Sequence, residues 1–260
     1  MSLELPATTY SMAVTRRHYV VWRKLIWPSL ATNVANPILF LFAFGFGLGR
    51  FIDTMDGMSY LAFVVPGMIA YGAMFAAAFE TSIGSFTRFH LMKNWDAVLA
   101  TPVSLRELLF GEALWASIKA MLSAVCVLAV GAIWGGVPSM SGALLSLPVV
   151  FLAAFCFACC GLVATSIAKG YEFFSYYFTF WVTPMFIFCG VFFEIDRFPL
   201  AVQVISWALP MTHMVAVIRP LSNGLPLEPA WLAVHLGYLL VLTVAAYLIA
   251  YNRTRRRMFD

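Results

Sequence analysis

Four ionisable side chains lie within or at the ends of long apolar stretches of the sequence: Glu80, Glu112, Lys119 and Glu172. A charge in such surroundings is costly, and it usually faces a protein interior or a water-filled path. Glu112 and Lys119 are seven residues apart, which places them on one face of a helix. Two interpretations follow. The charges form either a polar seam that moves as the protein works or, more simply, a fixed ion pair between helices near one membrane surface.

Motifs for nucleotide binding and hydrolysis are missing from the sequence. It contains no G-x-x-x-x-G-K-[ST], H-E-x-x-H or G-x-S-x-G pattern, so the chain does not hold ATP phosphates by the usual loop. Gly45 and Gly49 favour a small-residue contact between helices over a dinucleotide site. The four histidines are scattered, so we expect no metal site. Cys156 and Cys159 fit small positions on a membrane helix better than a redox or metal pair.

The composition is that of a membrane protein. Of 260 residues, 62% are hydrophobic and 11% are charged, whereas a soluble domain has about 25% charged residues. A hydrocarbon core of about 30 Å needs roughly 20 apolar residues of helix. Continuous apolar runs can satisfy their backbone in lipid only as helices. We therefore predict an all-α membrane protein, a single domain over residues 1–260, with six spans at about 29–49, 60–82, 108–134, 144–168, 173–193 and 231–252.

The positive charges predict the orientation of these spans. With the N-terminus in the cytoplasm, twelve Lys and Arg residues fall on the inside and three on the outside, a strong positive-inside bias. Both termini are therefore predicted to be cytoplasmic. The basic stretch Arg16–Lys24 precedes the first span without the pattern of a cleaved signal, so we expect that span to be retained. The basic residues sit at span ends rather than on one clustered face, which argues against nucleic-acid binding.

The inner connection, residues 83–107, is longer than a hairpin needs. Apolar residues recur in it at helical spacing with charges between them. We predict a short amphipathic helix on the cytoplasmic face from Phe86 to Leu99, ended by Pro102. Its principal residues are Phe89, Met92, Lys93, Trp95, Asp96 and Leu99.

The outer connection, residues 194–229, contains two apolar pieces, 198–209 and 211–218, each too short to cross a bilayer. Pro210 and Pro220 bound them. We predict a re-entrant hairpin of two short helices that also carries His213 and Arg219, placed where protein or water satisfies its backbone.

Residues in the first and fifth spans are candidates for a transport path. Asn33, Asn36 and Pro37 interrupt the first span, and they either line a path for a polar head group or kink the helix. The middle of the fifth span is rich in aromatic rings, which can pack against sugar rings or acyl chains. Ordinary packing against lipid is the simpler alternative for these rings, which are Tyr177, Phe180, Trp181 and Phe186.

Several segments resemble the permease subunits of type-2 ABC exporters. The likeness is closest to the NodJ-like branch for lipooligosaccharides and polysaccharides, which borders on drug-export permeases. The segments are Lys93–Pro102 with Leu108–Glu112, and Thr183–Phe193 with Phe198–Pro199, Leu209–His213 and Arg219. The resemblance covers nearly the whole chain.

The resemblance implies a bacterial inner-membrane complex of two copies of this chain and two copies of a separate ABC ATPase. ATP and Mg would bind the ATPase, and this chain would hold no cofactor. The predicted cytoplasmic helix would sit in a groove of the ATPase as a coupling helix. Arg16–Lys24 would form an amphipathic helix at the membrane interface. The cargo path would follow the first, second and fifth spans.

We therefore predict a non-catalytic permease subunit of an ATP-driven exporter. Its cargo would be amphipathic: a lipid-linked saccharide first, another lipid or a hydrophobic drug second. One alternative is a secondary transporter, which would need inverted repeats and intramembrane ion-coupling groups. Another is a membrane-embedded lipid-modifying enzyme, which would need convergent catalytic groups. Its outer-face candidates are His213, Glu194 and Asp196.

Overall fold

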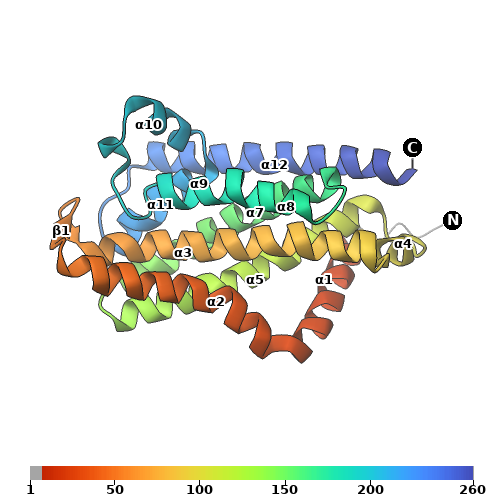
Figure 1. Cartoon of the computed structure of the whole chain (residues 1–260), viewed down its shortest axis with the longest axis horizontal. Coiled ribbons are helices and arrows are strands. Elements are labelled where there is room, and N and C mark those ends of the chain that lie inside the picture. Colours follow the sequence, from red (N-terminus) through yellow and green to blue (C-terminus); the bar gives the residue numbers. More distant parts are fainter. Residues whose placement is uncertain (1–7, 260) are drawn as a thin grey trace.

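The computed structural model of the chain describes residues 8–259, apart from the side chains of residues 8, 9, 25 and 30–33. Long helices run side by side along the longest axis of the molecule (Figure 1). One end, here called the α4 end, holds α1, α4 and the last turns of α12, and the opposite α10 end holds β1 and α10. The helices are α1 (Thr8–Trp22), α2 (Ile26–Phe42), α3 (Tyr60–Phe79), α4 (Asn94–Leu99), α5 (Leu105–Ile133), α6 (Met140–Leu145), α7 (Leu147–Ile167), α8 (Glu172–Tyr177), α9 (Thr183–Phe188), α10 (Leu200–Trp207), α11 (Pro210–Ser222) and α12 (Pro229–Phe259).

Within the described residues, five helical runs are long and apolar enough to cross a membrane: Ile26–Arg50, Tyr60–Leu91, Leu105–Ile133, Met140–Ile167 and Pro229–Phe259. The all-α membrane architecture predicted from the sequence is thus confirmed. The predicted fifth span is helical over 17 residues, from Glu172 to Phe188. At 1.5 Å per residue it is about 25 Å long, slightly less than a typical hydrocarbon core.

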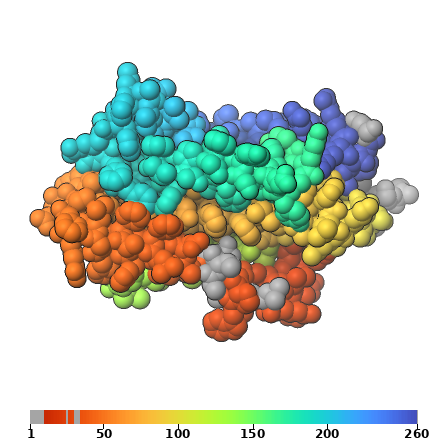
Figure 2. Space-filling model, in the orientation of Figure 1, coloured from red at the N-terminus to blue at the C-terminus, as the bar shows by residue number. Residues whose placement is uncertain are grey.

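The predicted outer hairpin corresponds to α10 and α11, which are bent by 86° relative to each other. This pair counts as a further span only if it is taken as one broken helix. Figure 2 shows α10 and its flanking turns as a knob that stands out from the body at the α10 end. Its exposed apolar side chains include Leu200 and Val204.

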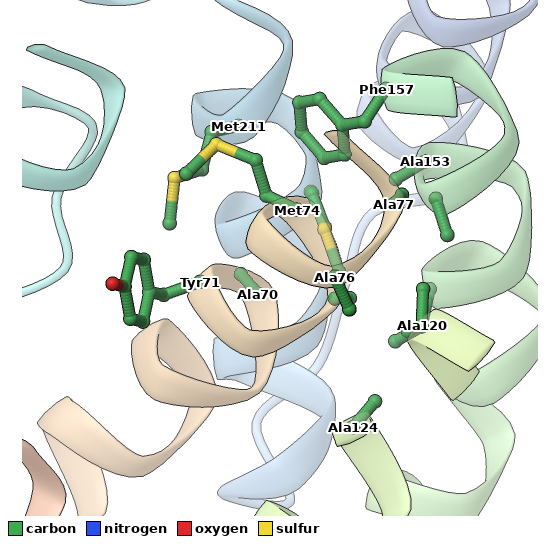
Figure 3. Packing of buried hydrophobic residues seen from close by; sticks show 14 of the residues in the cluster. Ala70, Tyr71, Met74, Ala76, Ala77, Ala120, Ala124, Ala153, Phe157 and Met211 are labelled. Atoms are coloured by element: carbon green, nitrogen blue, oxygen red, sulfur yellow. The ribbon is translucent and has the colours of Figure 1, made fainter. Parts of the chain in front are cut away.

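Helix α3 is the centre of the bundle, since nearly all of its side chains are buried and it contacts α2, α5, α7 and α11. In lipid, helices associate through close packing rather than through the hydrophobic effect, and small residues permit that approach. Figure 3 shows alanines of α3, α5 and α7 gathered around this centre, with larger side chains filling the space between them. The labelled residues are Ala70, Tyr71, Met74, Ala76, Ala77, Ala120, Ala124, Ala153, Phe157 and Met211.

In the described part of the chain, four helical segments are π-helical: Ala43–Gly47, Glu80–Gly84, Thr87–Leu91 and Phe178–Val182. A π-helical turn shifts the backbone hydrogen bonds by one residue and leaves carbonyl groups in need of donors. The Thr165 hydroxyl of α7 donates to the carbonyl groups of Thr81 and Ser82 at 2.7 and 2.9 Å. These two carbonyl groups of the widened turn therefore find their hydrogen-bond donor on α7, a neighbouring helix. The helix that contains the turn continues to Leu91.

A short β-hairpin forms part of the connection between α2 and α3. Strands β1 (Thr54–Met55) and β2 (Met58–Ser59) are antiparallel, with Thr54 opposite Ser59. Asp56 and Gly57 between them have φ angles of 53° and 72°. A two-residue turn with positive φ at both positions favours Asp-Gly, so the sequence suits this turn.

The predicted bounds of the cytoplasmic helix, Phe86–Leu99, were wrong. The helix that begins at Tyr60 continues to Leu91, and α4 begins only at Asn94. Lys93 lies between them with a φ of 49°. A left-handed residue breaks a right-handed helix, so residues 86–91 extend the second span and α4 has only six residues.

One prediction about the prolines was also wrong. Pro220 does not bound a helix, because α11 continues past it to Ser222, whereas Pro210 does begin α11. Pro37 lies inside α2, and the first span departs from α geometry after it, at the π-helical turn Ala43–Gly47 and the 3-10 turn Leu48–Arg50. Neighbouring helices make such prolines tolerable in a membrane helix.

The close approach of α6 to α11 generates a stability prediction. A Cβ atom added to Gly142 would lie 1.9 Å from the backbone oxygen of Leu221, whereas one added to Gly237 of α12 would meet no atom within 4 Å. We expect Gly142→Ala to lower the free energy of unfolding by about 1–3 kcal/mol through overpacking. Thermal unfolding of the purified protein in detergent measures this as a lower Tm. Gly237→Ala is the matched control, and a Gly142→Ala Tm at or above the control contradicts the packing.

Candidate functional site

Two buried carboxylates and two partly buried cations form a cluster near the α4 end, between the second and third spans. We call Glu80, Arg88, Glu112 and Lys119 the charge cluster. Arg88 donates from Nη1 to Glu80 Oε1 at 2.8 Å and from Nε to Glu112 Oε2 at 3.1 Å. Lys119 Nζ donates to Glu80 Oε2 at 2.6 Å. Two carboxylates and two cations thus neutralise one another. The Arg88–Glu112 and Lys119–Glu80 pairs join the second span to α5, the Arg88–Glu80 pair lies within the second span, and Glu112 and Lys119 of α5 are not paired with each other.

Glu112 is the centre of these contacts, and its side chain is 1% exposed. Besides Arg88, it accepts hydrogen bonds from Trp95 Nε1 of α4 at 3.0 Å and from Ser85 Oγ at 2.8 Å. His18 Nε2 of α1 lies 3.2 Å from Glu112 Oε1. One carboxylate therefore connects α1, α4, α5 and the second span.

Helix α1 reaches Glu112 through a face of small and polar residues. Ser11, Val14, Thr15 and His18 are buried at helical spacing. They pack against α5 at Gly111, where an added Cβ atom would lie 2.7 Å from Val14 Cβ. The glycine is therefore needed for α1 to approach closely enough for His18 to contact Glu112.

Helix α4 has an inward face and an outward face. Trp95 is 1% exposed, and its ring centroid lies 5.0 Å from that of Phe89 in the second span. Leu99 is half-buried, whereas Met92, Lys93 and Asp96 are exposed. Of the predicted coupling residues, Phe89, Trp95 and Leu99 therefore attach α4 to the bundle, and Met92, Lys93 and Asp96 remain open to a partner.

A cavity of about 300 Å³ lies between the second span and the helices of residues 172–188. We call it the aromatic cavity. Apart from the Thr183 hydroxyl and the phenol of Tyr71, its wall is apolar, and the π-helical turn Phe178–Val182 forms part of it. Such a wall suits an acyl chain or an apolar ring system. It is lined by Tyr71, Phe75, Phe79, Ile83, Phe178, Val182, Thr183 and Phe186.

The predicted path residues do not gather at this cavity. Phe186 lines it, but Phe180 is 73% exposed, and Tyr177 and Trp181 pack against the core. Asn36 and Glu172 are exposed at separate places. The side chain of Asn33 lies outside the described residues.

A second cavity, of about 540 Å³, lies between α1, the start of α2, the second span and α5. We call it the basic cavity because Arg17, Arg88 and Lys119 line it together with Glu80. Trp22 and Trp115 supply apolar surface. Phe79 and Ile83 line both cavities, so the two adjoin at these side chains.

At the α10 end, Arg219 of α11 holds backbone groups from two other segments. Its guanidinium donates to the carbonyl oxygens of Phe63, at 3.2 Å, and Gly190, and it lies 3.6 Å from the centre of the Phe63 ring. Asn223 donates to the carbonyl of Ala62 at 3.2 Å. The outer hairpin is thereby attached to the start of α3 and to the turn after α9.

The hairpin also contacts α12 through two histidines. His213 Nε2 lies 2.9 Å from the carbonyl oxygen of Trp207, which can only accept, so Nε2 carries the hydrogen. In the neutral ring, Nδ1 of His213 then accepts from Nδ1 of His235 at 2.9 Å. The ring of Tyr238 stacks on His213 at 3.8 Å.

The candidate residues for an outer-face enzyme do not converge. Both ring nitrogens of His213 are engaged inside the hairpin. Glu194 accepts from Arg197 at 2.8 Å and from the backbone N–H of Asp56 at 3.2 Å. The hydrogen bond from Arg197 lowers the pKa of the partly exposed Glu194 carboxyl, which suits an ion pair at the surface better than a general base.

Arg88 and His18 were not predicted as members of the cluster. The sequence contained a signal for Arg88, because the apolar runs carry two acidic residues, Glu80 and Glu112, but only one basic residue, Lys119. A second cation was needed to balance them. The spacing of Ser11, Val14, Thr15 and His18 on a predicted helix contained a weaker signal for His18. Neither signal indicates which carboxylate the residue contacts.

Comparison with known proteins places the chain in a family. The model of the family described as ABC-2 type transporter matches residues 11–221. Nodulation protein J of Rhizobium meliloti (strain 1021) is 36% identical over 255 residues, which cover 98% of this chain and 96% of that protein. Nodulation protein J of Rhizobium leguminosarum bv. viciae is 37% identical over 95% of this chain and 94% of its own length. The inner membrane transport permease YadH of Escherichia coli (strain K12) is 28% identical over 89% of each chain. The chain belongs to the ABC-2 type transporter family.

Proposed function

We propose that this permease is the membrane half of an ATP-driven exporter, in which two copies associate with two copies of a separate ABC ATPase. The observation that carries the proposal is the hydrogen bond from Trp95 to Glu112. Through it, the short helix α4 is attached to the charge cluster, and the cluster connects three further helices. A displacement of α4 by an ATPase would therefore be transmitted to the second and third spans.

The distribution of charge supports a cytoplasmic α4 end. The last turns of α12 carry Arg253, Arg255, Arg256 and Arg257 at this end, as the positive-inside bias requires. Arg257 donates to the carbonyl oxygens of Thr165, Ser166 and Ala168 at the end of α7. We infer an inner-membrane protein with both termini in the cytoplasm.

The proposed cargo is amphipathic, with a lipid-linked saccharide as first choice and another lipid or a hydrophobic drug as second. The aromatic cavity supports an apolar cargo segment, because its wall offers five aromatic rings and few polar groups. The likeness to nodulation protein J supports the first choice by analogy. A hydrophobic cationic dye, transported in place of a labelled lipooligosaccharide, would favour the second.

Coupling through α4 is tested by Trp95→Phe, which keeps an aromatic ring but removes the N–H that donates to Glu112. A hydrogen bond to a charged group contributes about 1.5–3 kcal/mol, so we expect ATP-driven uptake into inverted vesicles to fall roughly tenfold. The probe is a fluorescent lipooligosaccharide. Co-purification of the ATPase subunit with the tagged variant shows that the complex still assembles.

Trp27→Phe is the matched control, because Trp27 is 79% exposed and lies outside the cluster. It should transport as the unmodified protein does. Equal uptake by the Trp95 and Trp27 variants would exclude coupling through this hydrogen bond. Uptake driven by an ion gradient without ATP would instead favour a secondary transporter.

The role of the aromatic cavity is tested by filling it. Thr183→Trp places an indole in the cavity wall, and the displaced volume should reduce transport of the same probe about tenfold or more. Thr179→Trp is the control, since Thr179 is exposed in the same helical run and does not line the cavity. If both variants transport alike while the ATPase still binds, the cargo does not use this cavity.

A further inference from the structure

The wall of the basic cavity is partly apolar and partly positively charged. Trp22, Trp115, Phe79 and Ile83 supply apolar surface, while Arg17 and Lys119 bring positive charge. The cavity lies beside the charge cluster, but its volume of about 540 Å³ is not filled by the ion pairs. Its size and wall suit a ligand with both a polar and an apolar part.

The charges that face the cavity are not balanced. Glu80 uses one carboxylate oxygen on Arg88 and the other on Lys119. The donors of Arg88 are directed to Glu80, Glu112 and Ser85. The cavity therefore offers no carboxylate oxygen that lacks a cation.

Two cations have donors to spare. Within residues 8–259, the Lys119 ammonium donates one hydrogen bond, to Glu80, although an ammonium carries three N–H donors. Arg17 is exposed and makes no hydrogen bond to any described residue. Groups that satisfy such donors carry negative charge and several acceptor oxygens, as a phosphate does.

The apolar part of the wall indicates what the phosphate is attached to. Phe79 and Ile83 separate the basic cavity from the aromatic cavity and line both. A chain attached to a phosphate near Arg17 and Lys119 can lie over these side chains toward the aromatic rings. A free inorganic anion would make no use of this surface.

We propose that the basic cavity binds the phosphate head group of an anionic membrane lipid, with its acyl chain lying against Phe79 and Ile83. The inference rests on the proposed function only in placing the α4 end at the cytoplasmic leaflet. The bound lipid connects Arg17 of α1 to Lys119 of α5. It thereby supports α1 in the position where His18 contacts Glu112.

The experiment uses the purified full-length protein in phosphatidylcholine nanodiscs that contain a small fraction of phosphatidylglycerol with a diazirine on its acyl chain. After illumination, mass spectrometry measures labelling of the peptides that contain Trp22, Phe79, Ile83 and Trp115. We expect at least about fivefold more labelling than with phosphatidylcholine carrying the same chain. Arg17→Gln should reduce phosphatidylglycerol labelling about fivefold.

Arg16→Gln is the matched control. It removes the same charge from the adjacent exposed position of α1, and Arg16 does not line the basic cavity. Labelling in this variant should stay within about twofold of the unmodified protein. Equal labelling by the two head groups, or equal losses in the Arg16 and Arg17 variants, would overturn the site.

Inorganic phosphate added to the same nanodiscs distinguishes the two sources of the ligand chemistry. Undiminished labelling supports a lipid site, whereas full competition would overturn the lipid assignment in favour of a free anion. The assay contains neither ATP nor ATPase. A failure of ATP-driven transport would therefore leave the labelling result intact, and a failure of labelling would leave the transport result intact.

Discussion

A buried charge inside an apolar helix bundle must have polar or charged partners. Glu112 is such a charge, and several helices must be positioned so that their side chains reach it. Breaking a buried ion pair by removing one partner costs about 3–5 kcal/mol, because the remaining charge is left uncompensated. The contacts to Glu112 come from α1, α4 and the second span. The positions of three elements relative to α5 are therefore linked to one carboxylate. The short helix α4, which has only six residues, depends most on such an anchor.

The π-helical turns fit the same requirement. Glu80 begins one of them and Arg88 lies in the next, eight residues later along the same helix. The hydroxyl of Thr165 and the side chains of Ser85 and Arg88 supply donors to the carbonyl groups of residues 80–82. Arg88, which neutralises both carboxylates, thus also donates to the widened backbone. The irregular geometry of this segment and its charge pairing support each other.

Features that depend on hydropathy and charge averaged over many residues, such as the spans, could be predicted from the sequence. Features that depend on the conformation or orientation of a single residue could not. Continuous apolar runs identify the helices, and the cost of a buried charge singles out Glu80, Glu112 and Lys119. The left-handed conformation of Lys93 has no sequence signal, because lysine rarely adopts it, so α4 was joined to residues that extend the second span. In residues 172–188 nearly every face carries an aromatic ring. Periodicity therefore could not distinguish Phe186, at the cavity, from Phe180, on the exposed surface.

The charge cluster and the aromatic cavity share one helix, so under the proposed function motion at α4 would have a short route to the cavity wall. Glu80 is adjacent in sequence to Phe79, and Ile83 follows within the same π-helical turn, so the helix that carries one half of the cluster also forms one wall of the cavity. The remainder of α3 is packed through glycine and alanine against its neighbours, which leaves it little freedom to shift. The opposite wall contains the π-helical turn Phe178–Val182. A push on α4 would therefore change the cavity at its two irregular turns, while the close-packed centre of α3 stays in place.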